Sequence, residues 1–139
     1  MFKKVLFPVD QSRESREAAD TVANIVKTYN SRLIILSVVE TVDDDGEPST
    51  ATERTMSSPE AIAQLLESAK TAFHNHGIEA EVLEREGKPA FVICDVADEI
   101  GANLIIMGCR GLGLTEEGMA DSVTNRVINL SPCPVLIVP

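Results

Sequence analysis

The chain has 139 residues, of which 44% are hydrophobic and 24% are charged. This length and composition predict a single globular domain over residues 1–139. The 12 Lys and Arg residues are outnumbered by 22 Asp and Glu residues, which gives a formal net charge of −10. Such a charge repels polyanions, so nucleic acids and anionic membrane surfaces are not expected as partners.

Two further features indicate the compartment. Uninterrupted apolar runs are short, as in residues 5–9, so no segment is expected to span a bilayer. The three cysteines, Cys94, Cys109 and Cys133, contain no CxxC pair. Isolated cysteines in an odd number are typical of a reducing cytoplasm, and they do not indicate a disulfide framework or a zinc site. We therefore expect a cytoplasmic protein.

The first half of the chain alternates between two periodicities. The apolar runs at residues 2–9 and 33–39 predict buried strands. Between them, Ser12 is suited to cap a helix whose apolar positions recur every three or four residues, at Ala18, Ala19, Val22, Ala23 and Val26. Residues 41–57 are acidic and polar, and they predict a long mobile loop.

The second half repeats the alternation. Pro59 and Pro89 each occupy a favourable first position of a helix. The segment from residue 78 to 84 alternates apolar and acidic residues, which predicts a strand with one solvated face or a strand at a sheet edge. Residues 104–107 predict a central strand, a glycine-rich loop follows from Gly108 to Gly118, and a helix is expected to start near Ser122. The apolar run at residues 135–138 predicts the last strand.

Five strands alternating with four helices predict an α/β fold, a three-layer Rossmann-like sandwich with a parallel sheet. Ligands of such folds bind beyond the carboxyl ends of the strands, where the strand order reverses. Polar or glycine-rich residues follow the first strand, at Asp10, and the fourth strand, from Gly108. The order 3-2-1-4-5 would bring these two ends to one crevice and would leave the alternating third strand at an edge.

The glycine-rich loop after the fourth strand has two interpretations. Glycines allow the backbone to bring N–H groups close to a ligand, and the following helix adds free N–H groups and the positive end of its dipole. Together these features would form a phosphate cradle. Alternatively, the glycines only turn the chain from strand to helix. Neither GxGxxG after the first strand nor GxxxxGK[ST] is present, which argues against a dinucleotide-binding Rossmann domain and a P-loop enzyme.

Four segments carry a resemblance to one family. They are Pro8-Val9-Asp10, Gly108-Cys109-Arg110-Gly111-Leu112-Gly113, Ser122-Val123-Thr124-Asn125-Arg126-Val127 and Ser131-Pro132-Cys133-Pro134-Val135-Leu136-Ile137-Val138. In this order and spacing, over nearly the whole chain, they resemble the universal stress protein family. The family's ATP-binding branch is marked by Gly-x2-Gly-x9-Gly-[Ser/Thr]. Gly108, Gly111 and Ser122 match that motif, whereas Asp121 replaces the third glycine.

The resemblance implies an adenine nucleotide as the ligand (ATP, ADP or AMP), with Mg²⁺ as a candidate counter-ion. Asp10 would hold the ribose or the adenine, Val9 and Val38 would line the base, and Met107 would form the floor. Taken alone, the positions of Val38 and Met107 favour core packing. The full set of implied nucleotide-binding residues is Pro8, Val9, Asp10, Val38, Met107, Gly108, Arg110, Gly111, Ser122 and Val123.

Asp121 divides two functional hypotheses. A carboxylate about 4 Å from a phosphate charge costs about 1 kcal/mol in water and up to about 4 kcal/mol at a protein surface. Glu116 and Glu117 add negative charge to the same loop, and Arg110 offsets part of it. The first hypothesis is a nucleotide-binding stress-response or regulatory protein. The alternative is an interaction module in which Asp121 caps the helix and nucleotide binding is lost.

No catalytic residue is predicted. His74 and His76 are two residues apart near a helix end, so they do not share a helical face, and we expect them to be solvated and distant from the crevice. Ser122 has no histidine base beside it. The family resemblance permits slow ATP hydrolysis or self-phosphorylation without requiring either.

The last strand predicts assembly. Residues 135–138 are apolar throughout, and the order 3-2-1-4-5 places them at a sheet edge. An exposed apolar edge favours association, which a two-fold dimer through this strand would satisfy. The family resemblance implies the same homodimer.

Overall fold

Strands and helices alternate in the computed structural model, which describes residues 2–9, 13–40, 59–108 and 123–139. The strands are β1 (Lys4–Pro8), β2 (Arg32–Glu40), β3 (Ala80–Gly87), β4 (Leu104–Gly108) and β5 (Val135–Val138). The helices are α1 (Arg13–Tyr29), α3 (Pro59–Asn75), α4 (Pro89–Ile100) and α6 (Val123–Leu130). Ser12 and the predicted acidic loop at 41–57 lie outside the described residues.

The five strands form one parallel sheet in the order β3-β2-β1-β4-β5, which confirms the predicted order. β3 is an edge strand, as its alternating pattern predicts, with Glu81 exposed and Ala80 buried. It begins at Ala80, two residues after the predicted start at residue 78, and it ends later than predicted, because its pairing with β2 continues to Glu40 opposite Gly87. Backbone hydrogen bonds to the neighbouring strand therefore extend β3 through residues that carry no apolar signal.

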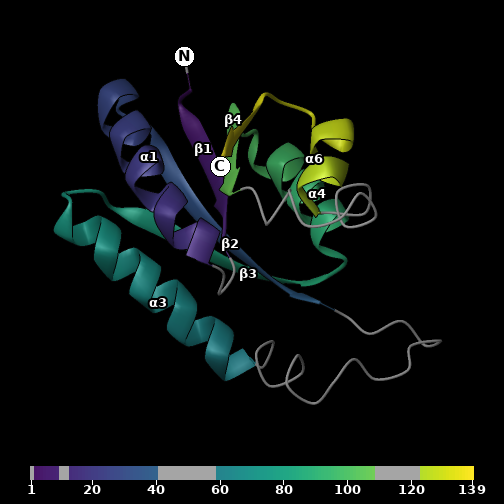
Figure 1. Cartoon of the computed structure of the whole chain (residues 1–139), viewed down its shortest axis with the longest axis horizontal. Coiled ribbons are helices and arrows are strands. Elements are labelled where there is room, and N and C mark those ends of the chain that lie inside the picture. Colours follow the sequence, from purple (N-terminus) through teal and green to yellow (C-terminus); the bar gives the residue numbers. More distant parts are fainter. Residues whose placement is uncertain (1, 10–12, 41–58, 109–122) are drawn as a thin grey trace.

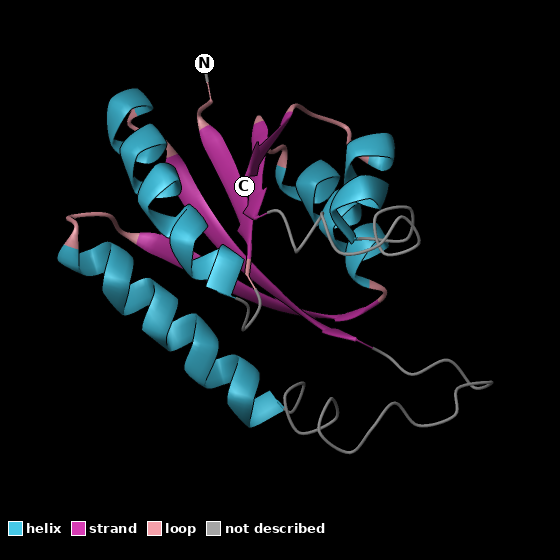
Figure 2. Ribbon diagram, viewed as in Figure 1, coloured by secondary structure: helices cyan, strands magenta, loops and turns pink. Residues whose placement is uncertain are grey.

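The sheet is covered on both faces, as Figures 1 and 2 show. Alternate strand residues such as Val5, Phe7 and Ile106 pack with α1 and α3 on one face. Their neighbours Leu6 and Ile105 pack with α4 and α6 on the other. The period-two alternation of a strand thus supplies two separate cores, and both sides of the central strands are removed from water.

The ends of α4 have clear local causes. Pro89 occupies the first turn, where a missing N–H costs nothing. Gly101 ends the helix in the left-handed conformation, with φ 68° and ψ 42°. The Lys4 ammonium donates a hydrogen bond of 2.9 Å to the Ile100 carbonyl, which ties the helix end to β1. Within the described ranges, no helix is long and apolar enough to cross a bilayer.

Candidate functional site

The predicted crevice lies where β1 and β4 end. These central strands pair in parallel, and the helices that follow them in the chain, α1 after β1 and α6 after β4, lie on opposite faces of the sheet (Figure 1). This is the topological switch point of an open α/β sheet, and it is the position at which such sheets bind ligands.

The pairing of β1 with β4 stops before either strand ends. Among the described residues it covers Val5 with Leu104 and Leu6 with Ile105. By contrast, β1 pairs with β2 as far as Pro8, and β4 pairs with β5 as far as Gly108. Toward their carboxyl ends, β1 and β4 are therefore not paired with each other. In the same region β1 stays paired with β2, and β4 stays paired with β5.

The β1 side of this opening is held by β2. The Val9 N–H donates to the Leu36 carbonyl at 2.8 Å, one residue beyond the end of β1. The Val9 side chain is 8% exposed and packs in the core under α1 and α3. Asp10, the next residue, lies outside the described residues.

The apolar residues at the opening do not share one face of the sheet. Met107 is buried in the core under α4 and α6, and half-buried Val38 packs against the same core, on the face opposite Val9. Core packing, which the positions of Val38 and Met107 favour, is thus their observed environment. Val38 keeps part of its surface exposed.

The β4 side is joined to the start of α6. The Thr124 hydroxyl donates to the Gly108 carbonyl at 3.3 Å, and Thr124 is a buried polar residue, 5% exposed. Val123, in the same turn, is half-buried against the core under α4 and α6. The first turn of α6 therefore lies at the end of β4, as a cradle built from strand end and helix start requires.

The structure thus brings together only part of the predicted site. Neighbouring strand ends carry Pro8, Val9, Met107 and Gly108, and the Thr124 hydrogen bond adds Val123. The predicted residues Asp10, Arg110, Gly111 and Ser122, together with Asp121, lie outside the described residues. Thr124 is absent from the predicted set. Its position could have been inferred from the sequence, because Thr124 lies three residues before Val127 and therefore on the same, buried face of α6.

The two described cysteines sit in the core and not at the opening. Cys94 on α4 and Cys133 before β5 both contribute to the core under α4 and α6. Burial raises the pKa of the Cys94 thiol and that of the Cys133 thiol above their ordinary value. Both thiols are therefore held protonated at neutral pH, as in inert structural cysteines.

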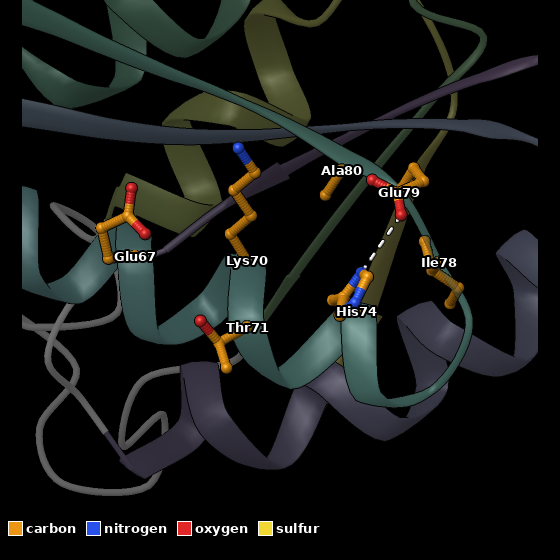
Figure 3. Close-up of a pocket in the computed structure, with 7 residues that line it drawn as sticks. All are labelled: Glu67, Lys70, Thr71, His74, Ile78, Glu79 and Ala80. Carbon is orange, nitrogen blue, oxygen red and sulfur yellow. Dashed lines mark hydrogen bonds and ion pairs between the residues drawn. The ribbon is translucent and has the colours of Figure 1, made fainter.

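A pocket of about 160 Å³ lies elsewhere, between α3 and the start of β3 (Figure 3). Because the strands are parallel, the pocket lies at the amino ends of the strands, whereas the opening between β1 and β4 lies at their carboxyl ends. His74 Nδ1 lies 3.1 Å from Glu79 Oε1 there, and both side chains are largely exposed. The residues that line the pocket are Glu67, Lys70, Thr71, His74, Ile78, Glu79 and Ala80.

His74 is therefore distant from the opening, as predicted. The described part of the chain contains no group of three or more His, Cys, Asp or Glu side chains arranged to hold a metal ion.

Known proteins resemble this chain over its whole length. Universal stress protein Sll1654 of Synechocystis is 60% identical over 139 residues, covering 100% of this chain and 87% of the relative. Universal stress protein YxiE of Bacillus subtilis is 35% identical over 154 residues, covering 99% of each chain. A solved universal stress protein in complex with cAMP superposes with a TM-score of 0.80 at 28% identity, covering 99% of this chain and 97% of that one.

A family profile gives the same assignment, and it spans every residue of the sequence. The profile of the universal stress protein family matches residues 1–139. Together with the fold and the two relatives, this match establishes that the chain belongs to the universal stress protein family.

Proposed function

We propose that this protein binds an adenine nucleotide across the carboxyl ends of β1 and β4 and acts through it as a stress-response regulator. The observation that carries the proposal is the central opening of the sheet, where pairing between β1 and β4 ends at Leu6 and Ile105. The structural neighbour whose complex contains cAMP is 28% identical and supports an adenine nucleotide as the ligand class.

Each part of the ligand has a candidate partner. The Asp10 carboxylate would accept a hydrogen bond from a ribose hydroxyl or from the adenine amino group. By family resemblance Val9 and Val38 would line the base; Val9 is buried in the core under α1 and α3, so half-buried Val38 would supply the exposed apolar surface. The phosphates would lie toward Gly108 and the first turn of α6, where the positive end of the helix dipole favours an anion. Arg110, Gly111 and Ser122 belong to this phosphate end by family resemblance.

The negative charge near the proposed phosphate-binding end of the site favours nucleotides that carry few phosphates. Asp121 stands where the family motif has glycine, and its repulsion acts on the outer phosphates most strongly. We therefore expect AMP to lose least affinity relative to a glycine-containing site, and ATP to lose most. Mg²⁺ would offset part of the repulsion for ADP and ATP.

Calorimetric titration of nucleotide-free protein with AMP, ADP and ATP, each with and without Mg²⁺, tests the proposal. Asp10→Ala should weaken binding by about one to two decades, because a hydrogen bond to a charged group contributes about 1.5–3 kcal/mol. Asp20→Ala, which removes an exposed carboxylate on α1, is the matched control and should bind like the parent. A parent protein that binds no nucleotide would overturn the proposal.

Asp121→Gly separates the two hypotheses raised by the sequence. If Asp121 repels phosphate, the variant should gain more affinity for ATP than for AMP, and low ionic strength should widen the difference. If Asp121 only caps α6 and the site is lost, the variant binds nothing and loses a few tenths of a kcal/mol of stability. That second outcome would favour the interaction-module hypothesis. Equal gains for both nucleotides would indicate loop flexibility.

We also propose that the protein is a homodimer through β5. β5 is a sheet edge, and the Leu136 side chain on it is 36% exposed. Ile137 instead packs against the core under α4 and α6, so a charge there would also destabilise the monomer. Leu136→Lys is therefore the cleaner test, and it should shift the protein to monomer in sedimentation velocity. A Leu136→Lys protein that remains dimeric would exclude this interface.

A further inference from the structure

β3 is an edge strand that lacks most of the features by which proteins protect the edges of their sheets. It is eight residues long, and it pairs with β2 in unbroken register, from Ala80 opposite Leu33 to Gly87 opposite Glu40. The order of the described sheet places no strand on its outer side. Such edges are commonly kept short or are interrupted by proline or by a bulge. β3 has neither proline nor bulge, so the backbone groups on its outer side are suitably arranged to pair with a further strand.

Charged side chains are the remaining protection of this edge, and nearly all of them are negative. Glu81, Glu84 and Glu86 are exposed, and Arg85 is the only basic residue of the strand. The Arg85 guanidinium itself lies 3.8 Å from the Glu99 carboxylate on α4. Like charges on facing strands repel, so this edge resists pairing with a second copy of itself. The same carboxylates would attract a strand that carries lysine or arginine.

The unneutralised carboxylates lie on one face of β3. On the face toward α4, Glu81 already forms an ion pair with Arg32. Glu84 and Glu86 lie on the other face, together with half-buried Val82, which packs against the core under α1 and α3. Within the described ranges, neither of these two carboxylates forms an ion pair. Along this face, β3 therefore changes from apolar at Val82 to anionic at Glu84 and Glu86.

We propose that β3 binds an extended basic segment of another protein as an additional strand of the sheet. The backbone of that segment would form hydrogen bonds with the outer edge of β3, and its alternate side chains would give specificity. Lysine or arginine would lie beside Glu84 and Glu86, and apolar side chains beside Val82 and Ala80. At the Ala80 end, the pocket of about 160 Å³ between α3 and β3 leaves space for an apolar side chain near Ile78 (Figure 3).

Short labelled peptides test the proposal by fluorescence anisotropy at physiological ionic strength. The probe alternates threonine with two valines and then with two lysines, and it is made in both chain orders because an added strand can run parallel or antiparallel to β3. One order should bind saturably, and its counterpart with glutamate in place of lysine should not. Only every second N–H of an added strand faces β3. N-methylation of one alternating set of peptide amides should therefore abolish binding, whereas N-methylation of the other set should not.

Variants of the protein locate the binding surface. Glu84→Lys combined with Glu86→Lys should weaken binding of the basic peptide roughly tenfold or more, because two attractions become repulsions. Glu84→Gln combined with Glu86→Gln should weaken it roughly two- to fivefold. Asp20→Lys combined with Asp98→Lys is the matched control, because it changes the net charge as much as the first variant at exposed positions on α1 and α4. This control should bind the peptide within about twofold of the parent, since distant charges are screened.

Three results would overturn the inference. A parent protein that binds neither chain order would show that this edge accepts no such strand. Equal weakening by the charge reversals on β3 and by the control would show attraction to the overall charge alone. Tolerance of both sets of N-methylated amides would exclude pairing as a strand. Nucleotide binding at the carboxyl ends of β1 and β4 is measured separately, so each of these results would leave the proposed function intact.

Discussion

Gly87, at the junction of β3 and α4, should tolerate no side chain. Its φ of +144° lies in a region that residues with a Cβ rarely occupy, and holding alanine there costs about 1–3 kcal/mol. A Cβ at this position would lie 2.8 Å from Val92 Cγ2. Val92 is β-branched and helical, so its χ1 angle cannot rotate freely to relieve the contact, and overpacking adds about 1–3 kcal/mol. Gly87→Ala should therefore destabilise the protein by at least about 2 kcal/mol.

Gly101 at the other end of α4 provides the matched control. It also has a positive φ, of +68°, but a Cβ there would meet nothing within 4 Å. Gly101→Ala should therefore cost only the left-handed conformation, about 1–2 kcal/mol. The difference between the two alanine variants therefore reports the contact with Val92 together with the difference between the two backbone conformations.

Urea denaturation of four proteins measures that contact directly: the parent, Gly87→Ala, Val92→Ala and the double variant. Val92→Ala removes the Cγ2 atom that the new Cβ would meet, so the double variant should be more stable than the sum of the single changes predicts. The coupling should be about 1 kcal/mol or more. A Gly87→Ala protein no less stable than Gly101→Ala, or a coupling near zero, would refute the reasoning.

Two further predictions concern the rest of the described structure. Lys4→Met removes the hydrogen bond to the Ile100 carbonyl and the positive charge at the end of α4, and should cost about 1 kcal/mol in urea denaturation, whereas the exposed Lys3→Met should change little. Burial raises the pKa of Cys94 above 9.0, so above that pH the unfolded chain loses this proton before the folded one does, and stability falls as pH rises. Urea denaturation at pH 8 and at pH 10 should therefore show a smaller loss of stability for Cys94→Ala than for the parent.

Much of the fold is predictable from the sequence because it depends on local patterns. The apolar run at 33–39, interrupted only by Ser37, and the run at 104–107 are typical of strands buried on both faces, and β2 and β4 both lie inside the sheet. The acidic alternation around Glu81 indicates an edge strand, and β3 is one. Pro59 and Pro89 begin helices, as expected from their fixed φ.

The features that escaped prediction depend on contacts between distant residues. Nothing near Thr124 in the sequence reveals that its hydroxyl would meet the Gly108 carbonyl, because that geometry exists only after β4 and α6 have packed. The opposite faces of Val9 and Val38 follow from the register of β1 against β2, where Pro8 lies opposite Leu36. A one-residue shift in that register would place Val9 and Val38 on the same face, and the apolar composition alone does not set the register.

Because the protein has a net charge of −10, binding of an anionic nucleotide at the proposed site must depend on groups close to that site. The field of so acidic a protein opposes the approach of any nucleotide. At physiological ionic strength, however, that field is screened beyond about 8 Å, so only groups beside the phosphate decide its binding. The first turn of α6 offers a phosphate only the positive end of the helix dipole, whose effect falls off within that turn. Attraction for phosphate at the proposed site would therefore depend on how closely the first turn of α6 lies to the end of β4, two elements that the hydrogen bond from the Thr124 hydroxyl to the Gly108 carbonyl joins.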